Sequence, residues 1–438
     1  MKVGVVGTGH VGLVTCASLA AVGHDVVGND LDEEKVAQLR RGDPWFYEPG
    51  LKELLGETMQ AGRLRFTSDP KEAMAGAEVV FICVGTPPRA SGEANLIAVE
   101  HAARSVAKHA DRDVVVVEKS TVPAGTAQRV KRTLHRERSN ALGRAEVVSN
   151  PEFLREGSAI EDSLSPDRIL IGAESRAAFD KMRELYAPFI DKGAPVIETD
   201  IPTAELAKHA CNAFLALKIS YVNALARLCE KSGGDVVAVA DVMGSDERIG
   251  RSFLNAGLGY GGYCFPKDVQ AFESLAARLG SEFPLLGEIA RINDRAVDAA
   301  CEKVIEALWN VEGKKVALLG LAFKPGTDDV RNAPALALAR KLLLEGARVV
   351  GYDPEGSANA KADCPQLEIA PDAYDAAADA HCVVICTEWP EIKELDLDKL
   401  TSAMAYPVIV DGRNLFDPED MKKAGVSYYP TGRPHISS

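Results

Sequence analysis

The sequence contains no apolar run of the about 18 residues that crossing a bilayer requires, so we expect no membrane-spanning segment. Its nine cysteines show no metal-ligand spacing, and we therefore expect no metal site. They are odd in number and scattered through apolar runs, which is typical of a protein kept in a reducing cytoplasm. The opening MKVGVVGTGHVGLV also lacks the unbroken apolar core of a signal peptide. We therefore expect a cytoplasmic protein.

Basic residues are also fewer than acidic ones. The chain has 50 Lys and Arg against 64 Asp and Glu, a formal net charge of −14. Repulsion at long range argues against nucleic acid or an anionic membrane as a partner, although a local basic pocket could still hold a small anion. What the chain does have is an ordinary globular composition, 46% hydrophobic and 26% charged over 438 residues. That length favours two or three domains.

The N-terminal region has the parts of a dinucleotide-binding unit in the required order. KVGVV predicts a buried strand, and Gly7, Gly9 and Gly12 then follow in G-x-G-x-x-G spacing. An amphipathic helix comes next, and a second strand ends at Asp30. A carboxylate at that place can accept hydrogen bonds from a ribose 2′-OH and would repel a 2′-phosphate. We therefore expect NAD as the cofactor rather than NADP.

Further short apolar runs end in polar residues. AEVVFICVGTPP, DVVVVEKSTVP and AEVVSNPEFL, with helical patterns between them, predict a mostly parallel sheet. Ligands bind beyond the carboxyl ends of the strands in such sheets. Candidate site residues at these ends are Thr86, Ser120, Thr121, Asn150 and Glu152. The alternative for some of them is a purely structural role in turns and helix caps.

The segment that begins at Ile201 changes to helical spacing. IPTAELAKHACNAFLALKISYVNALARLCEKSGG carries apolar residues on one face and has no breaker before Gly233, so it predicts one long helix. Such a helix could form a spine between domains. Lys208 and Asn212 stand four residues apart on it, so both could reach one ligand.

The last third of the chain repeats the pattern of the first. GKKVALLGLAFKPGTDDVRNAPALALARKLLLEGARVVGYDP again gives strand, glycine turn, helix, strand and acid, and AHCVVICTEWPE echoes AEVVFICVGTPP. We predict an α/β fold with two doubly wound, Rossmann-like parallel sheets joined by a long central helix. The expected domains are 1–200, 201–300 and 301–438. Phe323 and Lys324 stand in the second glycine turn, where the dinucleotide spacing is lost, so a mononucleotide is the expected ligand there.

The stretch GLGYGGYCFPKD, residues 257–268, crowds four glycines against Cys264. Glycine lets the backbone turn sharply or approach another group closely. Lys267 could favour the thiolate, and Asp268 could move protons. A cysteine nucleophile that works with a nicotinamide suggests oxidation of an aldehyde to an acid through a thiohemiacetal and a thioester. The alternative is an inert packing cysteine.

These motifs resemble the UDP-glucose/GDP-mannose dehydrogenase family over nearly the whole chain. The matching segments are GTGHVGLV, YEPGL (47–51), CVGTP (83–87), EKSTVP (118–123), SNPEFLREG (149–157), ELAKHACNAFLALKIS (205–220), RIG (248–250), GYGGYCFPKD (259–268) and FKPGTDDVRNAP (323–334). NAFLALKIS and CFPKD resemble the UDP-glucose branch more than the GDP-mannose or UDP-N-acetylmannosamine branches, which remain the alternatives. One departure is Tyr263, where family members usually have a small residue, and it bears on the sugar preference.

The resemblance implies a four-electron oxidation in which UDP-glucose, two NAD and water yield UDP-glucuronate and two NADH. Cys264 would be the nucleophile, and Lys208 would stabilise the developing oxyanion. Asp268 and Thr121 would order or activate a water, while Glu152 would assist hydrolysis of the thioester.

The resemblance also implies which residues hold the ligands, and it implies a homodimer in which Arg248 reaches the ligand of the other subunit. Expected NAD contacts are Gly7, Gly9, His10, Val11, Gly12, Asp30, Lys35, Thr86, Thr121, Glu156, Lys267 and Arg331. Expected contacts with the UDP-sugar are Glu152, Phe153, Leu154, Lys208, Asn212, Arg248, Phe253, Leu254, Gly261, Phe323, Lys324 and Arg413.

Two other functions remain open. A two-electron 3-hydroxyacid dehydrogenase shares a leading dinucleotide fold and a helical spine, but it would give one NADH per turnover and no role to Cys264. A non-catalytic nucleotide sensor would keep the fold without the chemistry. A sensor has no use for a nucleophile together with Lys208, Asp268 and Glu152.

Overall fold

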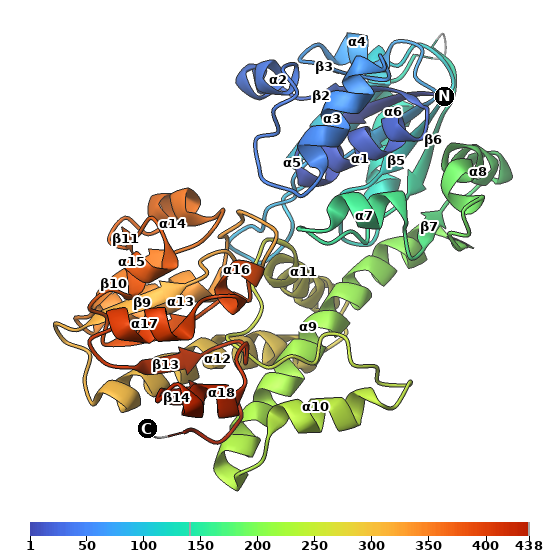
Figure 1. Ribbon diagram of the computed structural model, residues 1–438. Helices are drawn as coiled ribbons and strands as arrows, with labels where there is room; N and C mark the ends of the chain where they lie inside the picture. The colour runs from blue at the N-terminus through green and yellow to red at the C-terminus, as the bar shows by residue number, and fades with distance from the viewer. Residues whose placement is uncertain (140–141, 437–438) are drawn as a thin grey trace. The chain divides into compact units, whose positions relative to one another are not determined.

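The computed structural model describes residues 1–139 and 142–436, which fall into two compact units (Figure 1). The first unit contains residues 1–211 and 270–281, and the second contains 212–269 and the chain from 282 onward. Helix α9, Ile201–Ser232, runs through the boundary between them and is the long helix expected from the sequence. The division into domains 1–200, 201–300 and 301–438 stays a prediction.

An eight-stranded sheet forms the centre of the first unit, in the order β3-β2-β1-β4-β5-β6-β7-β8. Its strands are β1 Lys2–Val6, β2 Asp25–Asn29, β3 Leu64–Thr67, β4 Val79–Ile82, β5 Val114–Glu118, β6 Ala145–Ser149, β7 Ile169–Gly172 and β8 Val196–Thr199. Neighbouring strands run parallel except for β6 and β7, which are antiparallel. The strand order reverses between β1 and β4, and ligands bind at such a reversal in doubly wound sheets.

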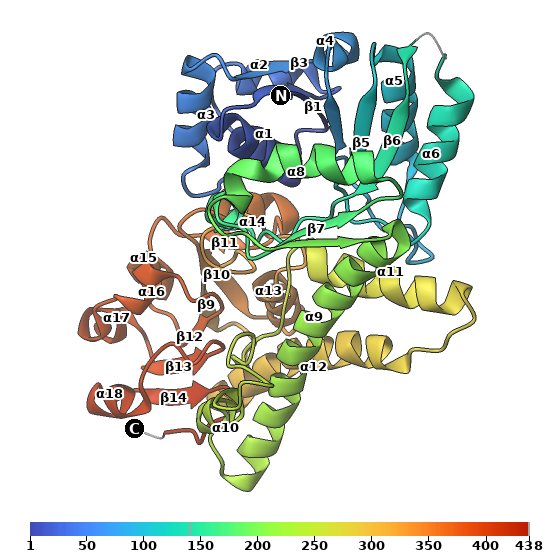
Figure 2. The same cartoon turned by 90° about the vertical axis from the view of Figure 1, so that its right-hand side faces the viewer.

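Helices cover both faces of this sheet. They are α1 His10–Ala21, α2 Glu33–Leu39, α3 Leu51–Gln60, α4 Pro70–Met74, α5 Ile97–His109, α6 Thr126–Glu137, α7 Ala159–Leu164 and α8 Arg176–Ile190. Side chains alternate along a strand, so Val3 and Val5 pack into a core with α1, α3 and α8. Val80 and Ile82 face the opposite core, which α5 and α6 close (Figure 2).

The second unit contains a six-stranded, fully parallel sheet in the order β11-β10-β9-β12-β13-β14. Its strands are β9 Lys315–Leu319, β10 Arg348–Tyr352, β11 Glu368–Ile369, β12 Cys382–Ile385, β13 Val408–Asp411 and β14 Ser427–Pro430. This is the order of β3-β2-β1-β4-β5-β6 in the first sheet, and β12 occupies the place of β4, whose sequence it echoes. The predicted fold class is confirmed.

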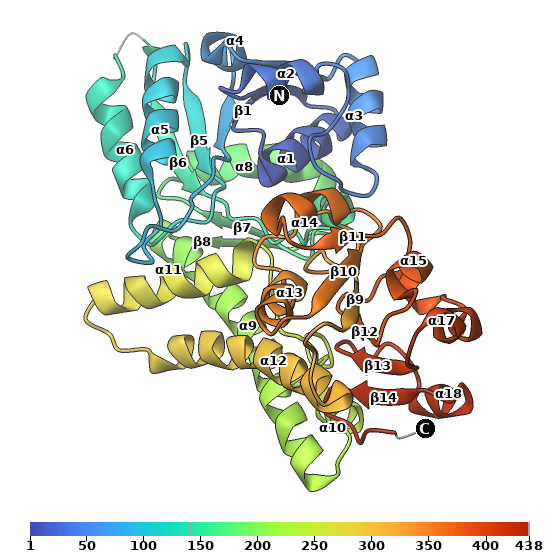
Figure 3. The ribbon, with the colours of Figure 1, turned by 90° about the vertical axis from the view of Figure 1, so that its left-hand side faces the viewer.

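The helices of the second unit again separate into two layers (Figure 3). They are α12 Pro284–Leu308, α13 Pro334–Leu344, α14 Ser357–Asp363, α15 Ala373–Ala377, α16 Pro390–Lys393, α17 Leu397–Ala403 and α18 Pro418–Lys423. Helix α10, Val236–Gly244, packs with the C-terminal part of α9 in a separate core. Val316 and Leu318 pack with α12 and α13, whereas Ala317 and Leu319 pack with α15 and α17. Helix α11, Cys264–Arg278, crosses the unit boundary as α9 does.

No helix in the described ranges 1–139 and 142–436 is both long enough and apolar enough to cross a membrane.

Candidate active site

The glycine turn after β1 has the geometry that a dinucleotide needs. Gly7 has φ 93°, and a Cβ on Gly12 would lie 1.9 Å from the Gly7 carbonyl oxygen, so neither position accepts a side chain. A Cβ on Gly9 would meet nothing within 4 Å, which leaves this side of the turn open. No side chain caps the N-terminus of α1, where His10 and Val11 begin the helix. The open turn and the uncapped helix end fit a pyrophosphate.

Asp30 lies directly beside this turn. Its Oδ2 accepts hydrogen bonds from Thr8 N at 2.9 Å and Thr8 Oγ1 at 2.7 Å, and Lys35 Nζ lies 3.9 Å away. Burial alone would raise the pKa of Asp30, but these hydrogen bonds, one from Asp32 N and the charge of Lys35 together hold it below its usual value. The carboxylate therefore stays ionised at the place expected for the ribose contact.

Glu48, in the YEPGL segment, is a residue to which the sequence assigned no role. Its Oε2 lies 3.1 Å from His10 Nε2, and its two oxygens accept hydrogen bonds from Gly157 N and Ala159 N at 2.8 and 2.7 Å. The His10 ring also stacks on Phe46 with ring centroids 4.3 Å apart. One buried carboxylate thus ties the first turn of α1 to the loop that contains Glu156. The YEPGL motif was the available signal.

The carboxyl ends of β4 and β5 bring two predicted NAD residues together. Thr86 is buried, and its Oγ1 donates to the carbonyl oxygen of Thr121 at 2.9 Å. Ser120 Oγ donates to the carbonyl of Val84 at 2.9 Å. These bonds hold the segments after β4 and β5 side by side at the edge where a ligand is expected.

Lys208 and Glu152 form a buried ion pair in the first unit. Lys208 Nζ lies 3.0 Å from Glu152 Oε1, and their side chains are only 5% and 6% exposed. The ammonium also lies 5.3 Å from the centroid of the Phe153 ring. Glu152 Oε2 is buried and has no hydrogen-bond partner among the described residues. A buried acceptor of this kind is favourable only when a ligand or a water donates a hydrogen bond to it.

A small cavity of about 90 Å³ lies next to this pair and is lined by Glu152, Phe153, Leu154 and the unpredicted Lys119, among others. Lys119 Nζ donates to Asn150 Oδ1 at 3.1 Å. Burial lowers the pKa of Lys119 to about 8, although the nearby Glu152 carboxylate partly offsets this effect. A second cation thus lies close to Glu152.

The glycines of the stretch 257–268 pack against protein within the second unit. A Cβ on Gly261 would lie 2.4 Å from the Asn332 carbonyl oxygen, and one on Gly262 would lie 2.8 Å from the Phe323 ring. Hydrogen bonds from Gly262 N to Arg331 O and from Asn332 Nδ2 to Gly262 O join the same two segments. The glycines therefore bring predicted substrate residues Gly261 and Phe323 together.

Cys264 is the first residue of α11. Its thiol is partly exposed. The N-terminal end of a helix carries partial positive charge, and such positions favour a thiolate. The start of α11 was not predicted from the sequence, because neither N-cap residues nor an apolar period marks it.

Asp268 is the centre of a buried hydrogen-bond network. Its Oδ2 accepts from Asn212 Nδ2 at 2.5 Å, and its Oδ1 lies 2.6 Å from Lys267 Nζ. Burial alone would lower the pKa of Lys267, but the charge and hydrogen bond of Asp268, with a contribution from Cys264, raise it above its usual value. Lys267 is therefore a permanent cation near the cysteine. Lys208, one helical turn before Asn212 on α9, belongs to the first unit.

Tyr263, the departure from the family pattern, has its ring next to two cations. The Arg331 guanidinium carbon lies 4.5 Å from the ring centroid and Lys267 Nζ lies 5.5 Å from it. Arg331 also forms an ion pair with Asp329. The ring thus lies next to two residues that we expected to contact NAD.

The second glycine turn is filled by protein groups. Asp353, at the end of β10, corresponds to Asp30 and accepts hydrogen bonds from Leu321 N at 2.6 Å and Ala322 N at 2.9 Å. Trp389 Nε1 donates to the same carboxylate at 3.0 Å. Asp30 also accepts hydrogen bonds from protein donors, but its side chain is 16% exposed, whereas Asp353 is only 2% exposed, so the second turn does not repeat the ribose site of the first unit.

Arg413 lies at the edge of this second turn. Its Nε donates to the Cys386 carbonyl at 2.7 Å and lies 3.2 Å from a Glu388 carboxylate oxygen. Phe323 and Lys324 follow on the neighbouring segment, with Lys324 Nζ 5.4 Å from the Phe323 ring centroid. Arg413 is thus a partly buried residue and not a surface arginine.

The remaining predicted substrate residues lie on the segment after α10. Leu254 is buried, and Phe253 has φ 65° with its ring 6.2 Å from that of Phe265. Arg248 is different, because its side chain is 88% exposed and pairs with Asp246. No described contact of Arg248 joins it to the groups around Cys264.

Comparison with known proteins agrees with this geometry. Models of the UDP-glucose/GDP-mannose dehydrogenase family match residues 1–190 (NAD binding domain), 202–295 (central domain) and 317–418 (UDP binding domain). The chain is 46% identical to a UDP-glucose 6-dehydrogenase of Rhizobium meliloti, over 99% of this chain and 100% of the relative. It is 43% identical to one of Bacillus subtilis, over 99% and 94%. A UDP-glucose dehydrogenase structure from Pyrobaculum islandicum matches with a TM-score of 0.91 at 40% identity, covering 99% of this chain and 98% of that one.

The first family model describes an NAD-binding domain, so the expected cofactor is confirmed. The family resemblance noted from the motifs is confirmed over nearly the full length. The chain belongs to the UDP-glucose/GDP-mannose dehydrogenase family.

Proposed function

We propose that this chain catalyses the NAD-dependent, four-electron oxidation of UDP-glucose to UDP-glucuronate in the cytoplasm. The product would serve as a sugar donor for polysaccharide biosynthesis. The observation that carries the proposal is the position of Cys264, at a helix N-terminus beside the Asn212–Asp268–Lys267 network. The names of the Rhizobium and Bacillus relatives support the choice of substrate.

The first oxidation converts the C6 hydroxyl of the sugar to an aldehyde. Bound NAD supplies the hydride acceptor. Asp268, whose two oxygens are fixed by Asn212 and Lys267, orders the water that takes the hydroxyl proton, with help from Thr121. Lys208 stabilises the negative charge that develops on the C6 oxygen.

The second oxidation uses Cys264. Its thiolate adds to the aldehyde carbon, and transfer of the hydride from the resulting thiohemiacetal to a second NAD would give a thioester. Water then hydrolyses the thioester and releases the acid and the thiol. Glu152, whose Oε2 is buried without a described partner, assists by accepting a proton from that water.

The ligands occupy the two Rossmann-like ends. The turn of Gly7, Gly9 and Gly12 would hold NAD, Asp30 would bind its ribose, and Lys35, Thr86 and Glu156 would complete its contacts. The sugar is held by Asn212 and the Glu152–Leu154 segment. The UDP group lies on Phe253, Leu254, Gly261, Phe323, Lys324 and Arg413.

The functional form in this proposal is a homodimer. Leu206, Phe214, Tyr221 and Leu228 recur along α9 and are 43%, 61%, 50% and 62% exposed in the single chain. An exposed apolar stripe on a long helix is typical of a protein interface. The partner would cover this stripe, and its exposed Arg248 would complete the pyrophosphate site of the neighbouring subunit.

A spectrophotometric assay of NADH formation with UDP-glucose, GDP-mannose and UDP-N-acetylmannosamine tests the substrate. We expect UDP-glucose to give the highest kcat/KM by about tenfold or more, since a site that pairs polar groups discriminates strongly. A higher value with either other sugar would contradict the proposed substrate. The absence of NADH formation with all three would favour the nucleotide sensor.

A further inference from the structure

A second cavity lies in the second unit and contains none of the residues proposed for NAD, sugar or catalysis. Its volume is about 310 Å³, at the lower end of the roughly 300–1,000 Å³ typical of ligand pockets. Most of its lining residues belong to α9 and α12, and Val410 and Thr431 also line it. Gly257, at the start of the stretch that leads to Cys264, also lines it, as does Leu228, so the cavity borders the apolar stripe of the proposed dimer.

The lining of this cavity is strongly basic. Its charged side chains are Arg227, Lys231, Arg291, Arg295, Lys303 and one acid, Glu230. That acid is already engaged, because its Oε1 accepts hydrogen bonds from Lys303 Nζ at 2.5 Å and from the Gly432 backbone N at 2.8 Å.

Three of these cations form no ion pair among the described residues, although the charge of Arg295, after the hydrogen bond from Arg291, helps to lower the pKa of Glu288. Arg291 pairs with Glu288, but Arg227, Lys231 and Arg295 make no ion pair or hydrogen bond within the part of the chain that the structure describes. Such a concentration is unusual in a chain whose net charge is −14. Cations gathered around one cavity repel each other and create a local positive potential that attracts an anion.

The apolar part of the cavity has small side chains. Ala224 and Ala226 on α9 and Ile292, Ala296 and Ala299 on α12 all line it. Small aliphatic residues leave room for a flat ring between two helices, where most of the surface of a small ligand can be buried.

Asn223 adds a polar group to this wall. It is only 4% exposed, and its Oδ1 accepts a hydrogen bond from Gly257 N at 2.8 Å. Its Nδ2 is buried and has no hydrogen-bond partner among the described residues. Because buried donors are nearly always paired, an acceptor on a ligand or on an ordered water is the missing partner.

We infer that this cavity binds a phosphate-bearing ligand with an apolar ring, of about mononucleotide size, at a site separate from the two Rossmann-like ends. Arginine is the side chain best suited to phosphate, since its planar guanidinium can donate two parallel hydrogen bonds to it. Arg227 and Arg295 hold the phosphate, and the alanine-lined wall holds the ring.

Isothermal titration of the full chain tests this inference. The protein is first saturated with NAD and UDP to occupy the ends proposed above, and the probes are AMP, inorganic pyrophosphate and citrate. We expect AMP to bind at one further site and the Arg227→Gln/Arg295→Gln double variant to weaken it at least about tenfold, equivalent to about 1.4 kcal/mol. Pyrophosphate should bind more weakly than AMP because it lacks the ring.

Arg278→Gln serves as the matched control, because Arg278, at the end of α11, is not among the residues that line this cavity and forms no described ion pair. It should leave AMP binding unchanged. Arg227 and Arg295 are not among the proposed catalytic groups. The comparison of AMP binding by the wild type and the double variant therefore tests this inference even if the chain acts on another substrate.

Three results would overturn the inference. AMP binding that the double variant does not weaken would place the ligand elsewhere. If citrate bound as tightly as AMP, the cavity would select for neither a phosphate nor a ring. The third result combines two observations: no probe binds, and light scattering shows that the folded double variant has a different oligomeric state. It would show that a second copy of the chain covers the cavity.

Discussion

Asp268 is held from two sides by donors of different kinds, an amide and an ammonium. Asn212 and Lys267 each bind one of its oxygens, so the carboxylate has little freedom to rotate. A group that must order a water needs such fixed geometry, since a misplacement of about 1 Å can cost roughly a hundredfold in rate. Asn212 therefore has two tasks in the proposed mechanism, to bind the sugar and to position Asp268.

Replacement of Asp30 tests the NAD end of the site. We expect Asp30→Ala to raise KM for NAD by about tenfold or more with a smaller change in kcat, because the lost contact serves binding in both the ground and transition states. Use of NADP relative to NAD should rise at the same time. Steady-state kinetics with both cofactors measures this. A wild-type enzyme that used NADP as efficiently as NAD would contradict the assigned role.

Glu118 predicts a pH dependence of stability. It ends β5 with 1% exposure, and burial raises its pKa from 4.5 to about 8. The folded state therefore holds a proton that the unfolded state releases between these values. Its contribution to stability is present at low pH and is lost as the pH rises toward about 8. The Glu118→Gln side chain does not titrate, so the variant lacks this contribution to the pH dependence of stability.

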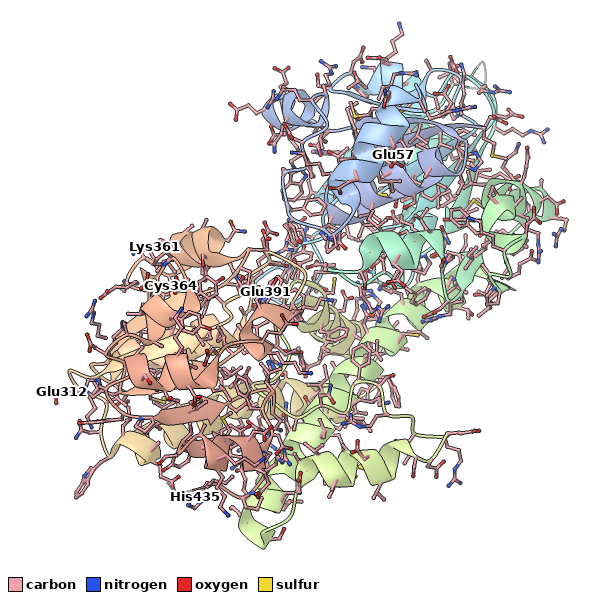
Figure 4. The ribbon with its side chains drawn as sticks, in the orientation of Figure 1. Glu57, Glu312, Lys361, Cys364, Glu391 and His435 are labelled. Atoms are coloured by element: carbon pink, nitrogen blue, oxygen red, sulfur yellow. The ribbon has the colours of Figure 1, made fainter. Side chains whose placement is uncertain are left out.

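Urea unfolding at about pH 5.5 and about pH 7.5 measures this difference. The free energy of unfolding of the wild type should fall relative to Glu118→Gln by roughly 2 kcal/mol over this interval. Glu57→Gln, on an exposed part of α3, is the control and should follow the wild type (Figure 4). Parallel pH profiles for wild type and Glu118→Gln would refute the shifted pKa.

Single-residue roles were the hardest to predict from the sequence. The motif EKSTVP drew attention to Thr121, but Glu118 and Lys119 only become notable through burial, which depends on strands far away in the chain. Glu48 likewise gains its role through contacts with Gly157 and Ala159. Long-range packing decides such roles, and local patterns do not contain it.

At the scale of elements, the sequence was more informative. The glycine spacing, the long helical period and the internal echo predicted the first Rossmann unit, α9 and the second sheet. The glycines before Cys264 were predicted to bring the backbone close to another group, and the structure shows that Asn332 and Phe323 are such groups. Whether a neighbour is ligand or protein depends on tertiary contacts and does not follow from glycine content.

Replacement of Gly261 tests the importance of that close packing. Gly261→Ala places a Cβ 2.4 Å from a backbone oxygen, which should destabilise the protein by about 1–3 kcal/mol and lower activity. Gly56→Ala within α3 is the control. Its Cβ would meet nothing within 4 Å, and alanine in a helix is favoured by up to about 1 kcal/mol. Chemical unfolding should separate the two variants, and equal stabilities would contradict the packing argument.

At the scale of the whole molecule, the proposed dimer makes each active site depend on two chains. Cys264→Ala and Arg248→Ala homodimers should both be inactive. Mixing the two proteins should restore activity, because a heterodimer contains one site with both intact residues. Subunit exchange is verified by native mass spectrometry. No recovery in a verified heterodimer would show that Arg248 serves its own chain.

The central claim is that one protein oxidises the sugar twice and needs Cys264 for the second step. The most direct test counts NADH formed per UDP-glucose consumed by the wild type and by Cys264→Ala. The wild type should give about two NADH, and the variant should lose net turnover by several orders of magnitude while still binding UDP-glucose. Full conversion to the acid by Cys264→Ala, or one NADH per sugar from the wild type, would contradict the account.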